Sequence, residues 1–357
     1  MPLASSKTLL EHARQAHYGI GGFNASNMEM VQAIVEAAEE EQAPVIVQIS
    51  QGTIKYAGLA FSATLVKTAA KLATVPVVLH LDHGTSVEQN ILCVREGFTS
   101  LMYDGTERVL DAYRLKSRTQ NPPFEILCEC IQSQEAFEEN VRATKMIAEI
   151  AHACSVPVEA ELGKIPRAED FTDMPVNARS SLPLTVRSRV RMLQADPVKA
   201  EQFVRLTNCD SLAVACGSIH GMKADIVPLD LGLIEDIAGR VNIPLVLHGS
   251  SGVLKTEVDA AARGIKLEKH EGSIREAIAR GIAKINVSTE LQLTFLHALG
   301  TAMERNPREK DLRKLFLPAK EALKINVRSL IRLFGSSGKA DAGSSCRFFR
   351  SSIEHGE

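Results

Sequence analysis

The sequence lacks several features that would tie a chain to a particular kind of partner. Its 41 Lys and Arg residues nearly balance 43 Asp and Glu residues, giving a net charge of -2. That charge leaves no basic surface of the kind that attracts nucleic acid or anionic membranes. No apolar run is long enough to span a bilayer, and residues 1–7 show no secretory apolar core. We therefore expect neither nucleic acid nor a membrane as partner.

Paired cysteine motifs are also missing. The seven cysteines are an odd number, and the closest two, Cys128 and Cys130, do not form a C-x-x-C pair. Disulfides are rare in reducing compartments, and an odd set of thiols fits such a compartment best. We therefore expect a cytoplasmic protein.

A glycine-rich dinucleotide fingerprint after the first strand is absent too, which disfavours a doubly wound sheet. The sequence instead alternates short apolar runs with amphipathic stretches. The runs are nearly continuous in apolar residues, as expected of strands that are buried on both faces of a parallel sheet. Eight such runs occur, at residues 21–24, 44–50, 75–83, 100–104, 156–161, 211–216, 244–248 and 282–287.

Apolar residues at helical spacing separate these runs, as in residues 28–41 and 137–152. Eight strands alternating with helices favour an α/β fold, a (β/α)8 TIM barrel with an additional C-terminal helix. We expect a single domain over residues 1–334. The Ser/Gly-rich residues 335–357 are expected to form a disordered tail.

Two segments do not fit the repeat. Residues 106–134 contain an Asn-Pro-Pro sequence, and residues 164–195 are rich in Arg, Ser and Pro. Long loops at the carboxyl end of barrel strands are often functional lids. We interpret the first segment as a peripheral insertion or as a stretch that is absent from the expressed protein.

Three histidines stand where a barrel places its catalytic groups. His83 ends the third predicted strand, His220 follows the sixth and His248 ends the seventh, and a glycine follows each of them. Because the carboxyl ends of barrel strands meet at one face, the three imidazoles can converge on one point. Three neutral histidines with an open fourth position describe a catalytic zinc site. We therefore predict that these three residues bind Zn2+.

Carboxylates cluster at the same face. Asp82 precedes His83, Asp104 ends the fourth predicted strand and Glu161 ends the fifth. A buried carboxylate is costly unless it is paired or lies near a metal. Helix capping remains an alternative role, above all for Asp104, which precedes a glycine. Asp82 lies between apolar residues and a histidine and fits a cap least well.

Two further segments have the composition of phosphate loops. Residues 248–252 (His-Gly-Ser-Ser-Gly) follow the seventh predicted strand, and residues 286–289 (Asn-Val-Ser-Thr) lead from the eighth toward a helix. Barrels commonly bind phosphate with the loops after these two strands, through backbone N–H groups and a helix N-terminus.

Taken together, these segments resemble the class II (zinc-dependent) fructose-bisphosphate and tagatose-bisphosphate aldolase family. The resemblance runs from about residue 8 to residue 339, apart from the two irregular segments. The phrases that carry it are Gly22-Phe23-Asn24, residues 48–52 (Gln-Ile-Ser-Gln-Gly), residues 80–84 (His-Leu-Asp-His-Gly), residues 158–163 (Val-Glu-Ala-Glu-Leu-Gly), His220-Gly221, residues 248–252 and residues 284–287 (Lys-Ile-Asn-Val).

The resemblance implies a role for each matching residue. The family's zinc ligands match His83, His220 and His248, and the zinc would polarise the ketose carbonyl. Asp104 and Glu161 match carboxylates that hold zinc in an alternative position. Asp82 would move the proton of the C4 hydroxyl, and Glu169 would exchange the proton at C3. The residues that match or flank the family's substrate- and phosphate-binding positions are Asn24, Ser50, Gly221, Gly249, Ser250, Ser251, Asn286, Ser288 and Thr289.

The resemblance also implies sugar phosphates as small-molecule partners and a homodimer or homotetramer. It leaves room for a second divalent or monovalent cation beside Zn2+. Departures from the family pattern are Pro166 and Arg167 in place of two hinge glycines, Met222 before Lys223, and Gln292 in place of an arginine for the distal phosphate. We expect cleavage of fructose 1,6-bisphosphate, with tagatose 1,6-bisphosphate as the alternative.

Three other interpretations stay open. Lys284, near the end of the eighth strand, could serve a metal-free Schiff-base aldolase, although three strand-end histidines would then lack a purpose. A metal-dependent barrel hydrolase would more often carry His-x-His on its first strand, where this chain has Gly22-Phe23-Asn24. The third interpretation is a degenerate aldolase scaffold without activity that acts as a binding protein.

Overall fold

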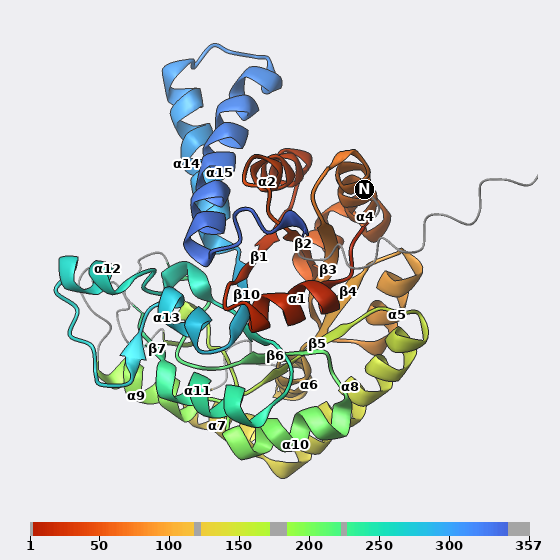
Figure 1. Ribbon diagram of the computed structural model, residues 1–357, viewed down its shortest axis with the longest axis vertical. Helices are drawn as coiled ribbons and strands as arrows, with labels where there is room; N and C mark the ends of the chain where they lie inside the picture. Colours follow the sequence, from red (N-terminus) through yellow and green to blue (C-terminus); the bar gives the residue numbers. More distant parts are fainter. Residues whose placement is uncertain (1–2, 118–122, 172–183, 223–226, 342–357) are drawn as a thin grey trace, which may run out of the picture.

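The chain folds around a closed barrel of eight parallel strands (Figure 1). The computed structural model describes residues 3–117, 123–171, 184–222 and 227–341. Around the ring the strands follow the order β1, β10, β8, β6, β5, β4, β3, β2, and β1 pairs with β10 and with β2, which closes it. The barrel strands are β1 (Ile20–Asn24), β2 (Val45–Ser50), β3 (Val77–Gly84), β4 (Ser100–Tyr103), β5 (Val158–Leu162), β6 (Ser211–Val214), β8 (Leu245–Leu247) and β10 (Ile282–Val287). The predicted TIM barrel and its eight strands are confirmed.

The barrel strands are buried on both faces because their side chains alternate between the layer under the helices and the barrel interior. In β2, Val45 and Val47 pack against the surrounding helices, whereas Ile46 faces the barrel interior. Helix α1 (Ser6–Gln15) lies across the amino-terminal end of the barrel (Figure 1). Its Leu9 and Leu10 pack on the inward-facing residues of the strands. The amino-terminal end is therefore plugged, and only the opposite end is available for a site.

Helices surround the barrel. The predicted helices at 28–41 and 137–152 are confirmed as α2 and α8. Asn27 caps α2 because its Oδ1 accepts a hydrogen bond from the Met30 amide at 2.9 Å. The outer helices are α2 (Met28–Glu40), α3 (Gln51–Ala57), α4 (Leu59–Leu72), α5 (Val87–Arg95), α8 (Gln134–Ala153), α10 (Pro197–Thr207), α11 (Leu231–Arg240), α12 (Glu257–Ala262) and α13 (Ile274–Ala279).

The two irregular segments contain helices that the sequence pattern did not predict. The first holds α6 (Gly105–Ser117) and α7 (Phe124–Gln132), and the second holds the short η1 (Ala168–Phe171) and α9 (Leu184–Met192). Leu110, Leu127 and Leu193 form one small apolar cluster, which joins the segments to each other. Residues 118–122 and 172–183 lie outside the described residues. The described part of the first segment is thus a pair of helices, and α6 packs beside the site.

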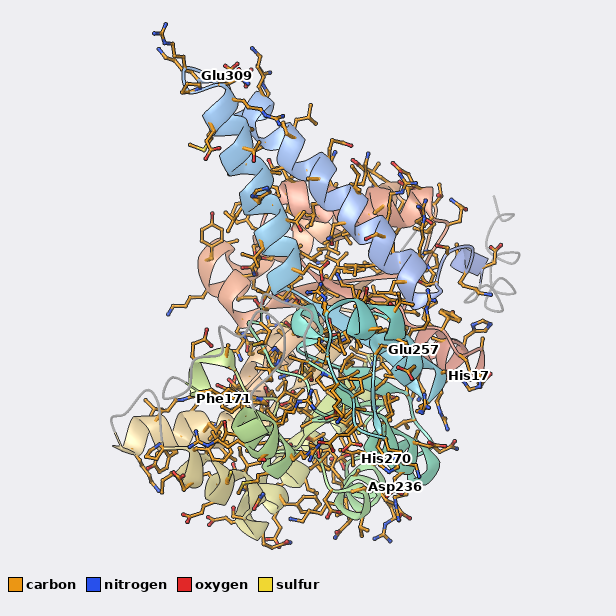
Figure 2. All side chains as sticks on the ribbon, turned by 90° about the vertical axis from the view of Figure 1, so that its left-hand side faces the viewer. His17, Phe171, Asp236, Glu257, His270 and Glu309 are labelled. Atoms are coloured by element: carbon orange, nitrogen blue, oxygen red, sulfur yellow. The ribbon has the colours of Figure 1, made fainter. Side chains whose placement is uncertain are left out.

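An arm of two helices extends from the barrel (Figure 1). It consists of α14 (Thr289–Arg305) and α15 (Leu312–Phe334), with Glu309 at its tip in Figure 2. Helix α15 returns along α14 and α2, and it is the expected additional C-terminal helix. None of the described helices is long and apolar enough to cross a membrane.

The segment that follows α15 corrects the predicted start of the disordered tail. Residues 335–341 pack against the end of α2, where the amides of Gly338 and Ala340 donate to the carbonyls of Glu41 and Gln42 at 2.9 and 2.8 Å. Ser336 is fully buried. Paired backbone groups and a buried side chain hold this stretch in place. Residues 342–357, the rest of the predicted tail, lie outside the described residues.

A small antiparallel sheet of two strands, β7 (Leu229–Asp230) and β9 (Glu271–Gly272), lies outside the barrel. Asp230 also caps α11, since its Oδ1 accepts from the Leu233 amide at 3.0 Å. This sheet orders the connections that follow β6 and precede β10.

Candidate metal centre and active site

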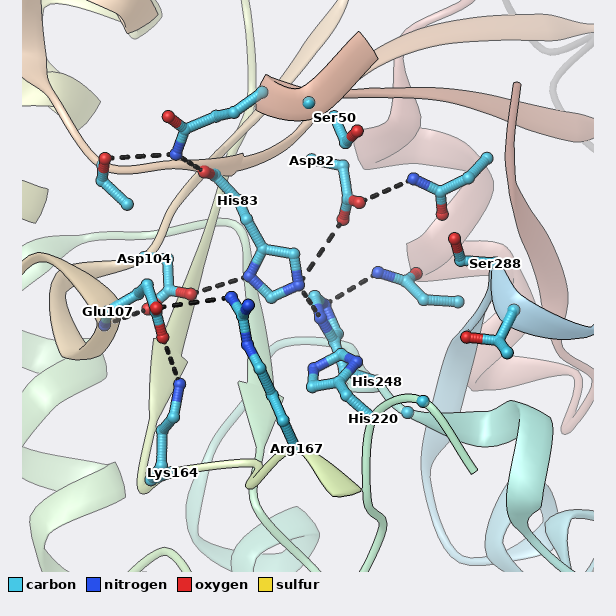
Figure 3. Close-up of a pocket in the computed structure, with 18 of the residues that line it drawn as sticks. Ser50, Asp82, His83, Asp104, Glu107, Lys164, Arg167, His220, His248 and Ser288 are labelled. Atoms are coloured by element: carbon cyan, nitrogen blue, oxygen red, sulfur yellow. Dashed lines mark hydrogen bonds and ion pairs between the residues drawn. The ribbon is translucent and has the colours of Figure 1, made fainter. Parts of the chain in front are cut away.

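The three predicted metal ligands meet at the open end of the barrel (Figure 3). One ring nitrogen from each of His83, His220 and His248 lies within 4.8 Å of the others. Nε2 of His83 and Nδ1 of His248 are 3.1 Å apart. His83 comes from the end of β3, His220 from the loop after β6 and His248 from the end of β8. The structure therefore brings together three residues that stand far apart in the sequence.

An irregularity at the end of β3 directs two consecutive side chains into the same cavity. Neighbouring residues of a regular strand point to opposite faces. Here the pairing of β3 with β4 changes register between Leu81 and Gly84, and His83 has a left-handed backbone with φ 53°. Asp82 and His83 consequently both line the cavity, which has a volume of about 550 Å³. A positive φ in a non-glycine residue is a strained conformation of a kind that clusters at functional sites.

Two carboxylates fix which nitrogen each imidazole presents. Nδ1 of His83 lies 2.7 Å from Oδ2 of Asp104, and Nε2 of His248 lies 2.8 Å from Oε1 of Glu159. Each ring donates this N–H to its carboxylate, which leaves lone pairs on Nε2 of His83 and Nδ1 of His248. Two lone pairs that face each other at 3.1 Å repel unless a proton or a metal cation lies between them. Carboxylate-oriented histidines are a recurring feature of metal sites, so the donor set fits a divalent cation.

The carboxylates around His83 favour a positive charge at the point where the three histidines meet. Burial disfavours its protonated ring, but the carboxylates of Asp82 and Asp104 outweigh burial and raise the pKa of His83 to about 10. Burial, aided by positive charge at His83, lowers the pKa of His220 and of His248 well below the ordinary value. Both rings are neutral, which is the form that ligates metals. A metal ion would supply the positive charge that the acidic groups attract.

A second group of converging ligand atoms lies on the Nδ1 side of His83. It consists of His83, Asp104 and Glu161. Burial, together with the nearby charge of Asp104, raises the pKa of Glu161 to about 8. Its Oε2 has no hydrogen-bond partner among the described residues. This group matches the pair of carboxylates that were predicted as alternative ligands.

Asp82 presents one carboxylate oxygen to the cavity. Its Oδ2 accepts from Nδ2 of Asn24 at 2.7 Å, and Gln48 in turn donates to Oδ1 of Asn24 at 3.0 Å. Its Oδ1 is buried, has no hydrogen-bond partner in the described part of the chain, and lies 3.9 Å from Nε2 of His83. Burial disfavours the charged form, but His83 outweighs it, so the pKa of Asp82 falls below its ordinary value. Asp82 is therefore an ionised group with a free acceptor atom beside the metal position.

The predicted phosphate loops lie beside the histidines. Gly249 has a left-handed backbone with φ 63°, and the turn that follows runs as the short η2 (Ser250–Gly252). The cavity wall includes the following predicted substrate-binding residues: Asn24, Ser50, Gly221, Gly249, Ser251, Asn286, Ser288 and Thr289. Ser250 is not among the wall residues that the structure describes, because its hydroxyl donates to the Asn286 carbonyl at 2.6 Å and is buried there.

The loop carboxylate Glu169 also reaches the cavity, opposite Gly221. The residues that replace the hinge glycines form a backbone bridge to the second predicted ligand. The His220 amide donates to the Pro166 carbonyl at 2.8 Å, and the Ala168 amide donates to the His220 carbonyl at 2.9 Å. The loop is thus held against the segment that carries His220. Lys223 lies outside the described residues.

Sequence reasoning missed a charged wall on one side of the cavity. Helix α6 contributes Glu107, whose carboxylate pairs with Lys164 and, at 3.3 Å, with Arg167 (Figure 3). It also pairs with Arg114 at 2.6 Å. Glu107 is itself buried, and Lys164 lowers its pKa to about 2 against the effect of burial. A glutamate one helical turn after Asp104 was the available signal, but the helix around it was not recognised.

Comparisons with known proteins agree over almost the whole chain. The family model described as fructose-bisphosphate aldolase class-II matches residues 4–339. A fructose-bisphosphate aldolase from Thermus caldophilus is 40% identical over 345 residues, covering 95% of this chain and 100% of the relative. One from Geobacillus stearothermophilus is 37% identical, covering 95% and 99%. Among solved structures, the YdjI aldolase from Escherichia coli K12 aligns with a TM-score of 0.67 at 31% identity, covering 95% and 99%. The chain belongs to the class II fructose-bisphosphate aldolase family.

Proposed function

We propose that the chain catalyses the reversible aldol cleavage of fructose 1,6-bisphosphate to dihydroxyacetone phosphate and glyceraldehyde 3-phosphate, with Zn2+ as its metal. The observation that carries the proposal is the meeting of three imidazole nitrogens with the free Oδ1 of Asp82 in one cavity. Aldol cleavage of this class needs a polarised carbonyl and a base beside it. The family and its named relatives supply the substrate class.

His83, His220 and His248 would hold the metal and leave a fourth position toward the cavity, which is the arrangement of catalytic zinc. Zinc bound there supplies Lewis-acid polarisation of the ketose carbonyl. Asp104 and Glu161, which meet His83 in the second ligand group, offer an alternative position for the metal or a place for a second cation. Oxygen ligands of this kind suit a hard divalent or monovalent ion.

Asp82 would move the proton at C4. Cleavage breaks the C3–C4 bond and turns the C4 hydroxyl into an aldehyde, so a base must accept the hydroxyl proton. Asn24 occupies Oδ2 of Asp82 and leaves Oδ1 for this proton. In the condensation direction the same carboxyl group returns the proton to the aldehyde oxygen.

Glu169 would move the proton at C3. The electron pair of the broken C3–C4 bond remains on the triose fragment, whose C3 must gain a proton before release. Glu169 lines the cavity, and the backbone bridge around Arg167 holds its loop beside His220. The two carboxylates thus divide the proton transfers of the reaction between them.

Backbone N–H groups and small polar side chains would bind the triose phosphate. The turn after β8 offers Gly249 and Ser251, and the start of α14 offers Ser288 and Thr289, so a helix N-terminus faces the same region. Asn286 and Gly221 complete this side of the cavity. Asn24 and Ser50 lie on the strands β1 and β2 and are assigned to the remainder of the sugar chain.

The proposal favours fructose 1,6-bisphosphate over its C4 epimer because the curated relatives with 34–40% identity are named fructose-bisphosphate aldolases. Gln292 stands where a distal-phosphate arginine was expected, so the preference is tested by the ratio of activities on fructose and tagatose 1,6-bisphosphate. Equal or greater activity on the tagatose sugar would reverse the assignment.

A homodimer or homotetramer is proposed on the surface of the α14–α15 arm. Large apolar side chains are exposed along it, among them Leu296 (61%), Leu312 (65%) and Ile325 (63%). Side chains of this kind gathered on one projecting element are typical of an interface. Light scattering after size exclusion tests this, and a monomeric mass would overturn it.

A reducing, cytoplasmic location is proposed from the cysteines. Six described cysteines are unpaired, and Cys93, Cys209 and Cys216 are buried. Fractionation of cells that express a tagged chain tests the location, and recovery from a secreted fraction would refute it.

Two alternatives give different results in the same assay. A Schiff-base mechanism would need an accessible Lys284, but its ammonium is buried and donates to Glu159 at 2.6 Å. Such an enzyme would resist chelators and would be trapped by borohydride with substrate. A scaffold without activity would cleave neither sugar bisphosphate under any metal condition.

The deciding experiment is cleavage of fructose 1,6-bisphosphate by the purified chain, with and without EDTA, followed by zinc add-back. The proposal expects activity that is lost with the chelator and restored by zinc. Activity that resists the chelator would overturn the three-histidine assignment. No activity on either sugar after zinc loading would favour the scaffold.

A further inference from the structure

A layer of charged and polar side chains lies inside the barrel directly below the metal position. His80, Glu159 and Lys284 each stand two residues before a residue of the site, namely Asp82, Glu161 and Asn286. Strand residues two apart point the same way, so this layer faces the barrel interior. The side chains of all three are at most 2% exposed. The proposed reaction uses none of them.

These groups form a continuous hydrogen-bonded chain. The Lys284 ammonium donates to Oε2 of Glu159 at 2.6 Å and to Nε2 of His80 at 3.1 Å. Below them, Nδ1 of His80 lies 2.7 Å from the Ser100 hydroxyl, which accepts from Ser6 of α1 at 2.8 Å. Above them, Oε1 of Glu159 accepts the N–H of His248 at 2.8 Å. The chain runs from the plug at the amino-terminal end of the barrel to a predicted metal ligand.

The donors and acceptors assign one arrangement of protons. An ammonium has donors only, so Nε2 of His80 must be the acceptor and its Nδ1 carries the hydrogen that Ser100 accepts. The same ammonium occupies Oε2 of Glu159, which directs Oε1 to His248. A carboxylate oxygen only accepts, so Nε2 of His248 carries the hydrogen, and Nδ1 keeps the lone pair that faces His83 at 3.1 Å. The Asn286 amide group also lies 2.8 Å from Nε2, and this assignment requires it to present its oxygen, not its nitrogen, to that N–H.

We propose that Lys284 is a positioning residue for the metal centre: through Glu159 it holds His248 in the tautomer and orientation that ligate the metal. The identity of His248 as a ligand rests on the proposed function, but the effect concerns metal affinity and needs no substrate. Stability alone is a poor reason for such a pair, because replacing both members of a buried ion pair by apolar residues is often neutral or stabilising. Loss of an outer partner of a ligating histidine typically weakens metal binding about 10- to 100-fold.

Three variants separate positioning from folding. Lys284→Met removes the ammonium and leaves Glu159 without its cation. The double variant Glu159→Gln with Lys284→Met removes both buried charges. Ser6→Ala removes the outermost link of the chain and serves as the matched control, since it leaves the Lys284–Glu159–His248 contacts in place. Each is compared with the wild type for its zinc dissociation constant, by competition with a chromogenic chelator, and for the urea midpoint of the metal-free protein.

We expect Lys284→Met to bind zinc about 10- to 100-fold more weakly and to unfold at a lower urea concentration. The double variant should recover much of the urea midpoint and still bind zinc at least about tenfold more weakly. Ser6→Ala should bind zinc like the wild type. Wild-type zinc affinity in the double variant would overturn the proposal, as would equal losses of affinity in the double and Ser6→Ala variants. If Lys284→Met does not fold, Glu159→Gln alone takes its place with the same expected loss of zinc affinity.

The same measurements are independent of the proposed reaction. A protein that binds zinc with the expected differences but cleaves no sugar bisphosphate would refute the aldolase assignment and keep the positioning role. A protein that cleaves the sugar bisphosphate but whose zinc affinity does not change when Lys284 is replaced would keep the aldolase assignment and refute the positioning role.

Discussion

At Gly249, one added methyl group should disturb the close contact between the turn after β8 and the segment that carries His220. Its φ of 63° lies in the left-handed region, and a Cβ built there would meet the carbonyl carbon of Ile219 at 3.0 Å and the amide nitrogen of His220 at 3.2 Å. Both neighbours are backbone atoms that no rotamer change can move. Gly249→Ala must therefore shift either the turn after β8 or the segment that carries His220.

Gly264 provides a matched control. It has φ 66°, close to that of Gly249, but no described atom lies within 4 Å of the position that a Cβ would take there. Alanine in the left-handed region costs roughly 1–2 kcal/mol at either position. Contact with fixed backbone adds about 1–3 kcal/mol of overpacking at Gly249 alone. A displacement approaching 1 Å within a catalytic site costs on the order of 100-fold in rate.

The assay compares free energy of unfolding, zinc affinity and kcat/KM for the two variants. We expect both to lose roughly 1–2 kcal/mol of stability from the backbone conformation. Gly249→Ala should in addition lose roughly 10- to 100-fold in kcat/KM, while Gly264→Ala stays near the wild type. Equal stability losses together with full activity of Gly249→Ala would refute the reasoning, because the close approach to Ile219 and His220 would then carry no cost.

Three more outcomes follow from the structure. Asp82→Asn should lower kcat by about 10²- to 10⁴-fold with little change in zinc affinity, measured by steady-state cleavage and chelator competition; retention of kcat would remove Asp82 from the proton transfer. Removing zinc with EDTA should lower Tm, because a ligand at about 100 times its Kd stabilises by about 2.7 kcal/mol; an unchanged Tm at saturating zinc would argue against a site in the folded chain. The Arg332 guanidinium lowers the pKa of Glu41 from 4.5 to about 2. Burial opposes this shift, and Arg328 and Ser337 add to it. A folded-state pKa below the unfolded one gives stability that is present above pH 4.5 and lost as pH falls toward 2. The wild type should therefore exceed Glu41→Gln by about 1 kcal/mol at about pH 6, with a smaller gap in urea titrations at about pH 3; a constant gap would contradict the ion pairing.

The convergence of His83 and His248 could be predicted because their positions follow from strand ends. His83 and His248 each close an uninterrupted apolar run, and parallel strands of a barrel bring such ends to one face. The outer partner Glu159 was not assigned a role, although the pattern was present. It stands two residues before Glu161, as His80 stands before Asp82 and Lys284 before Asn286, so one face of three strands carries polar and ionisable groups in two layers.

Other parts of the site could not be predicted because they depend on packing between distant segments. Ser250 belongs to a Gly-Ser turn, yet its hydroxyl is taken by the Asn286 carbonyl, a contact that spans two strands. Helices α6 and α7 were missed because the Asn-Pro-Pro sequence between them interrupts the apolar period. Their apolar residues pack against Leu193, which lies in the segment after β5. Local sequence could not show that partner.

The order of strands in the ring has a consequence for how the chain would acquire a metal at the proposed site. β3 and β8 stand four positions apart in either direction around the ring, so His83 and His248 approach each other across the barrel. They are 165 residues apart in the sequence. A metal held between them acts as a reversible cross-link across that long loop, and loop closure is costly before the ring forms. A chain whose ring is still open would offer a metal ion only isolated imidazoles, so binding at the proposed site would require a closed ring.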